Sequence, residues 1–153
     1  MLSLNTTTCE EAELHASSMA DIDDVTFDVI EEASKWQRCH RQIQDIERLT
    51  SGWDDAGAPP VSRALISSVW RVLQEFERHG FHTPTRISPT RAGTVCIEWQ
   101  LRSYIELEVV DGALEWLVQL PDGKIEQWRT EVETDSPTIE ASSGSLSDEF
   151  RAA

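Results

Sequence analysis

Four glutamates between residues 98 and 115 have the type and spacing that could do chemistry. They are Glu98, Glu106, Glu108 and Glu115. If this stretch is a β-meander, alternate side chains share a face, and Glu108 lies opposite Glu115. Glu98 then lies opposite Glu106 on the same face. Paired carboxylates can perform acid/base catalysis or bind a hard metal ion. A solvated acidic sheet face with nearby arginines is the commoner meaning of the pattern, and we assign no catalytic residue to it.

Apolar residues are expected on the same face. A second hairpin at Asp122-Gly123 would place Leu117 beside Trp128, with Tyr104 close by. Aromatic and apolar side chains surrounded by carboxylates are typical of a surface that binds a basic partner. Alternatively, a tail segment such as Val132 to Ile139, or the N-terminal arm, covers this patch within the chain. A homodimer through the patch is a further possibility.

A loop between two expected helices has an unusual composition, "LTSGWDDAGAPPVS". Its notable residues are Gly52, Trp53, Asp54, Gly57 and Pro59. Such residues usually serve loop geometry, so we expect Asp54 or Asp55 to accept backbone N–H groups. We expect Trp53 to close the end of the core. The alternative is a contact or catalytic loop, because loops on rigid scaffolds often carry function.

The segment "GWDDAGAPPVS", an amphipathic helix and a V-x-I-E-W strand together resemble a set of small uncharacterised bacterial proteins with a G-W-D-x-x-G-A-x-P loop. The resemblance covers roughly Leu49 to Leu120. It implies a similar order of helices followed by strands, and no known activity. Asp55 and Ala56 depart from the pattern, which has a small residue and an aromatic residue there.

Other sites of known chemistry do not match the sequence. The cysteines and histidines have neither C-x-x-C nor H-E-x-x-H spacing, so we expect no metal site and no disulfide framework. No nucleophile elbow, phosphate-binding glycine loop or dinucleotide fingerprint is present, and we expect no cofactor. The arginines of the helices alternate with acidic residues, which is typical of a salt-bridged solvent face rather than of a nucleic-acid surface.

Negative charge is concentrated at the two ends of the chain. The net charge is −15, and residues 1–34 contain nine acidic residues and no lysine or arginine. Residues 131–153 contain six acidic residues and one arginine, whereas residues 35–130 are nearly neutral. Phosphate binding needs clustered lysine and arginine, so this distribution argues against direct contact with nucleic acid. It favours a basic protein partner.

Hydrophobic periodicity predicts two helices in the first half of the chain. Apolar residues recur every three or four positions from Phe27 to Ile46, which predicts a helix ending near Thr50, before Gly52. A second helix is predicted from Arg63 to His79, capped by Ser62 and ended by Gly80.

From Thr94 the apolar period changes to two, which predicts antiparallel strands. A two-residue turn at Asp111-Gly112 pairs Val109 with Leu114 and, by the same register, Leu107 with Trp116 and Ile105 with Val118. "RISP" at residues 86–89 fits a short edge strand. We therefore expect an α+β fold in which two helices cover one face of a four- to five-stranded antiparallel meander.

The domain organisation follows from these elements. We expect a flexible acidic arm at residues 1–24, a single domain at residues 25–130 and a flexible acidic tail at residues 131–153. No secretory signal or membrane span is evident, so we expect a cytoplasmic protein. The leading functional hypothesis is a non-enzymatic interaction module, such as an antitoxin-like or immunity-like inhibitor or an accessory subunit. The alternatives are a carboxylate-based, metal-dependent hydrolase and a domain without a catalytic site.

Overall fold

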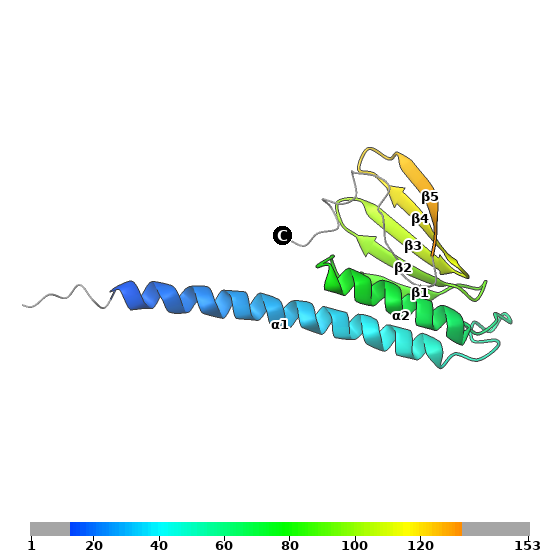
Figure 1. The fold of residues 1–153 in the computed structure, drawn as a ribbon, viewed down its shortest axis with the longest axis horizontal. Helices are drawn as coiled ribbons and strands as arrows, with labels where there is room; N and C mark the ends of the chain where they lie inside the picture. Colours follow the sequence, from blue (N-terminus) through cyan, green and yellow to red (C-terminus); the bar gives the residue numbers. More distant parts are fainter. Residues whose placement is uncertain (1–12, 133–153) are drawn as a thin grey trace, which may run out of the picture. The chain divides into compact units, whose positions relative to one another are not determined.

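The structure, a computed structural model, describes the backbone of residues 13–132 and the side chains of residues 29–132. Two helices are followed by five strands that form one antiparallel sheet in the order β1-β2-β3-β4-β5 (Figure 1). The elements are α1 (Glu13–Glu47), α2 (Arg63–Arg78), β1 (Arg86–Pro89), β2 (Val95–Gln100), β3 (Tyr104–Val110), β4 (Ala113–Gln119) and β5 (Ile125–Glu131). The expected α+β fold is confirmed, including the edge strand β1.

Helix α1 starts much earlier than the periodicity from Phe27 predicts. It begins at Glu13, so residues 13–24, which the sequence assigned to a flexible arm, are helical. The chain has no glycine before Gly52 and no proline before Pro59, so nothing in the sequence interrupts the helix. The contacts of the chain divide it into two compact units, Met1–Lys35 and Trp36–Ala153.

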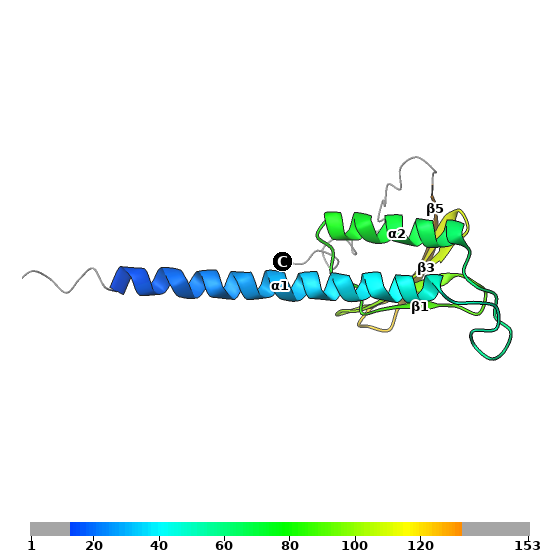
Figure 2. The same cartoon turned by 90° about the horizontal axis from the view of Figure 1, so that it is seen from below.

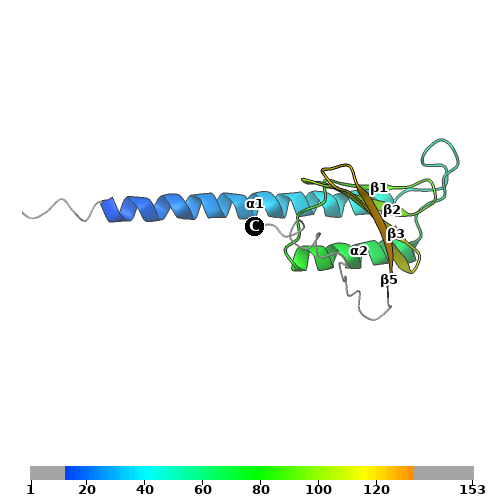
Figure 3. The same ribbon diagram turned by 90° about the horizontal axis from the view of Figure 1, so that it is seen from above.

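The second unit contains the hydrophobic core. Its part of α1 and the whole of α2 lie on one side of the sheet, as the two views in Figures 2 and 3 show. Trp36 and Ile43 of α1, Val69 and Phe76 of α2 and Trp99 of β2 are all buried in one cluster. The ring of Phe76 contacts the rings of Trp99 and Trp116 edge-on, with centroids 5.4 Å and 6.2 Å apart. These aromatic contacts join the second helix to the middle of the sheet.

Helix α2 has the ends that its sequence predicts. The hydroxyl of Ser62 accepts a hydrogen bond from the backbone N–H of Leu65 at 3.2 Å, which is an N-cap. Gly80 follows the helix with φ of +68°, a conformation that glycine adopts without steric cost.

The register of the central hairpin is the predicted one. Val109 pairs with Leu114, Leu107 with Trp116 and Ile105 with Val118. All six side chains are buried beneath the helices. The opposite side of the same hairpin is therefore free to carry polar residues.

The register predicted for the last hairpin is wrong by one residue. Its turn is a three-residue loop, Pro121 to Gly123, closed by hydrogen bonds from Leu120 N to Lys124 O and from Gly123 N to Leu120 O. Gly123 has φ of +85°, as the third residue of such loops does. The extra residue pairs Trp128 with Trp116, and Leu117 with Gln127.

This one-residue shift exchanges the two faces of β5. Trp128 lies on the helix-covered side, where its ring stacks on Trp116 with centroids 5.7 Å apart and planes 8° from parallel. It is part of the core margin and does not belong to the outer patch predicted from the sequence. Gln127 and Arg129 face outward in its place.

The stack gives a test of the register. Trp128→Ala should lower the free energy of unfolding by about 2 kcal/mol, because a partly buried ring is lost from the core. Gln127→Ala, its exposed neighbour, should change stability by less than about 0.5 kcal/mol. Urea unfolding of the two variants checks this, and equal stabilities would contradict the observed register.

Candidate functional site

The predicted glutamates lie on the outer face of the sheet, on the side opposite α2 and the second unit's part of α1. Glu98 of β2 pairs with Glu106 of β3, and Glu108 of β3 pairs with Glu115 of β4, as the sequence predicts. The face also carries Tyr104 and Leu117. We call these six residues, together with Gln127 and Arg129, the outer acidic face.

Directly opposed carboxylates repel one another, and each pair is relieved by neighbouring groups. Glu115 Oε1 accepts a hydrogen bond from Arg129 Nη1 at 2.6 Å. Glu108 accepts one from the hydroxyl of Thr94. Arg86 Nε lies 3.8 Å from Glu98 Oε2. The face therefore accommodates cationic groups, which Arg129 of β5 and Arg86 of β1 already supply.

Tyr104 connects Glu98 with Glu106. Its hydroxyl lies 2.8 Å from Glu98 Oε1 and 2.8 Å from Glu106 Oε2. A phenol has one proton and can donate to one carboxylate at a time. Burial, followed by these bonds to Glu106 and Glu98, raises the pKa of Tyr104 well above its ordinary value.

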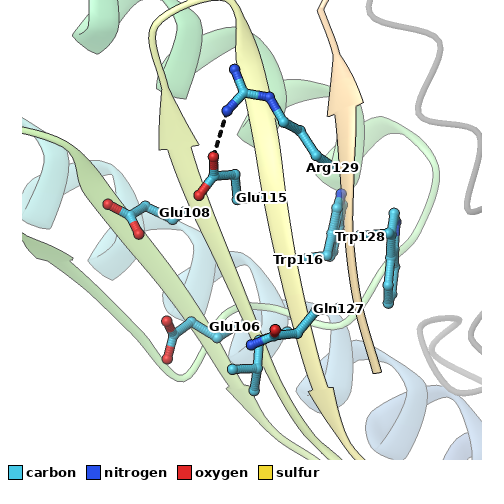
Figure 4. Close-up of a pocket in the computed structure, with 8 residues that line it drawn as sticks. Glu106, Glu108, Glu115, Trp116, Gln127, Trp128 and Arg129 are labelled. Atoms are coloured by element: carbon cyan, nitrogen blue, oxygen red, sulfur yellow. Dashed lines mark hydrogen bonds and ion pairs between the residues drawn. The ribbon is translucent and has the colours of Figure 1, made fainter. Parts of the chain in front are cut away.

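A shallow depression of about 370 Å³ opens on the outer acidic face (Figure 4). Its lining combines carboxylates of β3 and β4 with polar groups of β5. The residues are Glu106, Glu108, Glu115, Leu117, Gln127 and Arg129, with parts of Trp116 and Trp128. Leu117 is only partly buried and supplies the apolar part. The depression thus offers acceptors for a cation beside one aliphatic side chain.

Arg129 and Gln127 are the members of the site that the sequence analysis missed. The signal was present in "LPDGK", because proline followed by Asp-Gly also fits a type I turn with a left-handed third residue. Counting that loop as three residues places both side chains outward and Trp128 inward.

One group of possible metal ligands occurs among the described residues. Ligand atoms of Cys96, Glu98 and Glu106 lie within 4.8 Å of one another. Burial, with smaller contributions from nearby glutamates including Glu106, raises the pKa of the Cys96 thiol to about 12, which disfavours the thiolate that binds metal. The Tyr104 hydroxyl also contacts both carboxylates. This arrangement suits a hydrogen-bonded cluster better than a metal site.

The loop containing the Gly-Trp-Asp motif is held by its own hydrogen bonds. Asp54 Oδ1 accepts from the backbone N–H groups of Ala56 at 3.0 Å and Ala58 at 2.9 Å. Gly52 N donates to Ala58 O, and the indole N–H of Trp53 donates to Pro59 O at 3.1 Å. Of the two acceptors that the sequence left open, Asp54 and Asp55, it is Asp54 that accepts these hydrogen bonds.

The expected role of Trp53 as a plug of the core is wrong. Its ring is only partly buried and is not packed against the core cluster. Instead the loop contacts the hairpin turn between β1 and β2. Arg91 Nε of this turn lies 3.2 Å from Asp54 Oδ2. Gly93 packs closely against the loop, since a Cβ added to it would lie 3.2 Å from Pro59 Cγ. Gly57 lies inside the loop with φ of +88°. These contacts give the motif a role in loop geometry.

No protein-family model, curated protein or solved structure matches the chain. In the part of the chain that the structure describes, no helix has both the length and the apolar character needed to cross a bilayer.

The hydrogen bonds of Asp54 predict an effect on stability. Hydrogen bonds from Ala58 and Ala56 lower the pKa of the Asp54 carboxyl, with a further contribution from Arg91. The carboxylate therefore stabilises the fold above its ordinary pKa of 3.8, and this stabilisation is lost as the pH falls below that value. Asp54→Ala should lower the urea midpoint at neutral pH and remove this part of the acid dependence.

Asp55→Asn is the matched control for that experiment. Asp55 has φ of 57°, which asparagine tolerates, so its replacement should leave the midpoint nearly unchanged. Equal effects of the two substitutions would contradict the role assigned to Asp54.

Tyr104 is the only tyrosine in the chain, so its titration can be followed directly. Tyrosinate absorbance should develop well above pH 10.0, the ordinary value. Because the pKa is raised in the folded state, Tyr104 stabilises the fold below pH 10, and this stabilisation is lost as the pH rises. Glu98→Gln with Glu106→Gln should lower the titration midpoint, since it removes both neighbouring charges.

Glu115→Gln provides the control on the same face, because Glu115 pairs with Arg129 and has no bond to Tyr104. It should leave the tyrosine midpoint almost unchanged. A wild-type midpoint at the ordinary value would refute the cluster.

Proposed function

We propose that the protein is a non-enzymatic interaction module that binds a basic protein through the outer acidic face. The observation that carries this proposal is the depression in Figure 4, which is lined by three carboxylates and Leu117. It lies on the side of the sheet opposite α2 and the second unit's part of α1. Such a module would serve as an antitoxin-like or immunity-like inhibitor or as an accessory subunit.

The pairing of Arg129 with Glu115 supports the choice of a cationic partner. Its guanidinium lies 2.6 Å from the carboxylate while half of the side chain stays exposed, at 51%. Arginine recognises carboxylates through directional hydrogen bonds, so an arginine or lysine of a partner can use the free oxygens of Glu106 and Glu108 in the same way. The net charge of −15 would increase the rate of encounter with such a partner.

The bonds within the face favour binding over hydrolysis. A hydrolytic metal needs several oxygens that converge on one point. Glu108 is bonded to Thr94 and Glu115 to Arg129, and the cluster that does converge contains a thiol and a tyrosine-bound carboxylate pair. The carboxylates are thus arranged along a surface, which suits a partner's side chains.

Charge removal from the face tests the proposal. The variant Glu106→Gln, Glu108→Gln, Glu115→Gln should retain its fold and bind the basic partner about 30-fold more weakly, as three charge-assisted contacts together contribute about 2 kcal/mol. The partner would be isolated by affinity capture from cell extract and identified by mass spectrometry. Its affinity for each purified variant would then be measured by calorimetry at low and high salt.

The control variant Asp45→Asn, Glu47→Gln, Asp111→Asn removes the same charge from exposed positions outside the face. It should bind nearly as the wild type does. If both variants lose the same affinity, binding depends on overall charge and the proposed face is wrong.

A further inference from the structure

The first part of helix α1 is strongly acidic. Residues 13–34, which we call the acidic arm helix, contain seven aspartates and glutamates and no lysine or arginine. Lys35 follows at the end of the first compact unit and is paired with Glu31 at 3.2 Å and Glu32 at 2.8 Å. The arm helix therefore offers negative charge without an internal counter-charge of lysine or arginine.

Apolar side chains are exposed on this same helix. Val29 and Ile30 are 64% and 63% exposed and are two of the three large hydrophobic residues exposed among the described side chains. Val29 is seven positions before Trp36, which is buried, and Trp36 is seven before the buried Ile43. Residues seven apart lie on the same side of a helix. The apolar stripe that is buried at Ile43 and Trp36 therefore continues toward the N-terminus to Val29, which is exposed.

The charge of the arm helix decides what can cover these residues. A second copy packed helix to helix would bring seven carboxylates against seven, with few cations to offset them. Asp24, Asp28 and Glu32 also recur at intervals of four, a spacing at which like charges weaken a helix. A partner with lysines and arginines around an apolar groove would relieve both costs at once.

We propose that the acidic arm helix docks in an apolar, basic-rimmed groove of the partner, with Val29 and Ile30 as the apolar anchors. This mode is the binding of an amphipathic helix in a groove. It rests on the proposed function only in taking the same basic protein as partner, and it adds a second contact element to the outer acidic face. Two linked contacts increase the overall affinity beyond that of either alone.

Site-specific photocross-linking in the full chain separates the two contacts. Photoreactive p-benzoylphenylalanine would be placed at position 30 in one protein and at position 127 in another, and both would be irradiated in native cells. We expect both positions to cross-link to the same basic protein. The cross-linked protein would then be purified and its affinity for arm variants measured.

The substitution Val29→Asn with Ile30→Asn should weaken that affinity at least tenfold, because it removes both anchors while keeping a similar helix propensity. Ser34→Asn, an exposed change on the same helix, should leave the affinity unchanged. An unchanged affinity for the double variant would overturn the proposal.

The cross-links give the remaining outcomes. Cross-linking of position 30 to a second copy of the chain would overturn the docking of the arm on a basic partner. Cross-linking at position 127 alone would overturn it too and would leave the proposed function standing. Cross-linking at position 30 alone, with the tenfold loss, would support the arm and count against the outer face.

Discussion

The register of the β-meander is the constraint on which the rest of the structure depends. Each residue of a strand faces opposite its neighbours, so one residue more or less in a turn decides which side chains enter the core. The two-residue turn at Asp111-Gly112 buries Leu107 and Leu114 and leaves Glu108 and Glu115 outside. The three-residue loop before Lys124 then brings Trp128 inward and Arg129 outward. The acidic face and its compensating cation are thus products of turn length.

Most of the fold could be predicted because local signals agreed with the global pattern. In β3 and β4 the turn residues and the alternation of apolar residues selected the same register, and both helices of the second unit had clear stripes. Agreement between levels of this kind is what makes a sequence specify one structure. The pairing of the four glutamates followed directly from this register.

The predictions for the last hairpin, the start of α1 and the role of Trp53 were wrong because the local sequence there is compatible with more than one structure. "PDG" suits both a two-residue and a three-residue loop, and Trp128 is amphipathic enough for either face, so only the observed hydrogen bonds of Leu120 decide the register. The helix start at Glu13 could not be found from apolar spacing because the apolar stripe used for the prediction begins only at Phe27, well after Glu13. The hydrogen bond from the indole N–H of Trp53 to Pro59 O depends on the conformation of the loop, which amino-acid composition does not specify.

We propose that side chains of the outer acidic face recognise a basic protein, and methyl NMR of the leucine-labelled full chain tests this proposal most directly. On addition of the basic protein, the methyl signals of Leu117 should shift or broaden. Those of Leu73 and Leu107, which are fully buried, should stay unchanged. If the partner binds while the Leu117 signals do not move, the outer acidic face is not the binding surface.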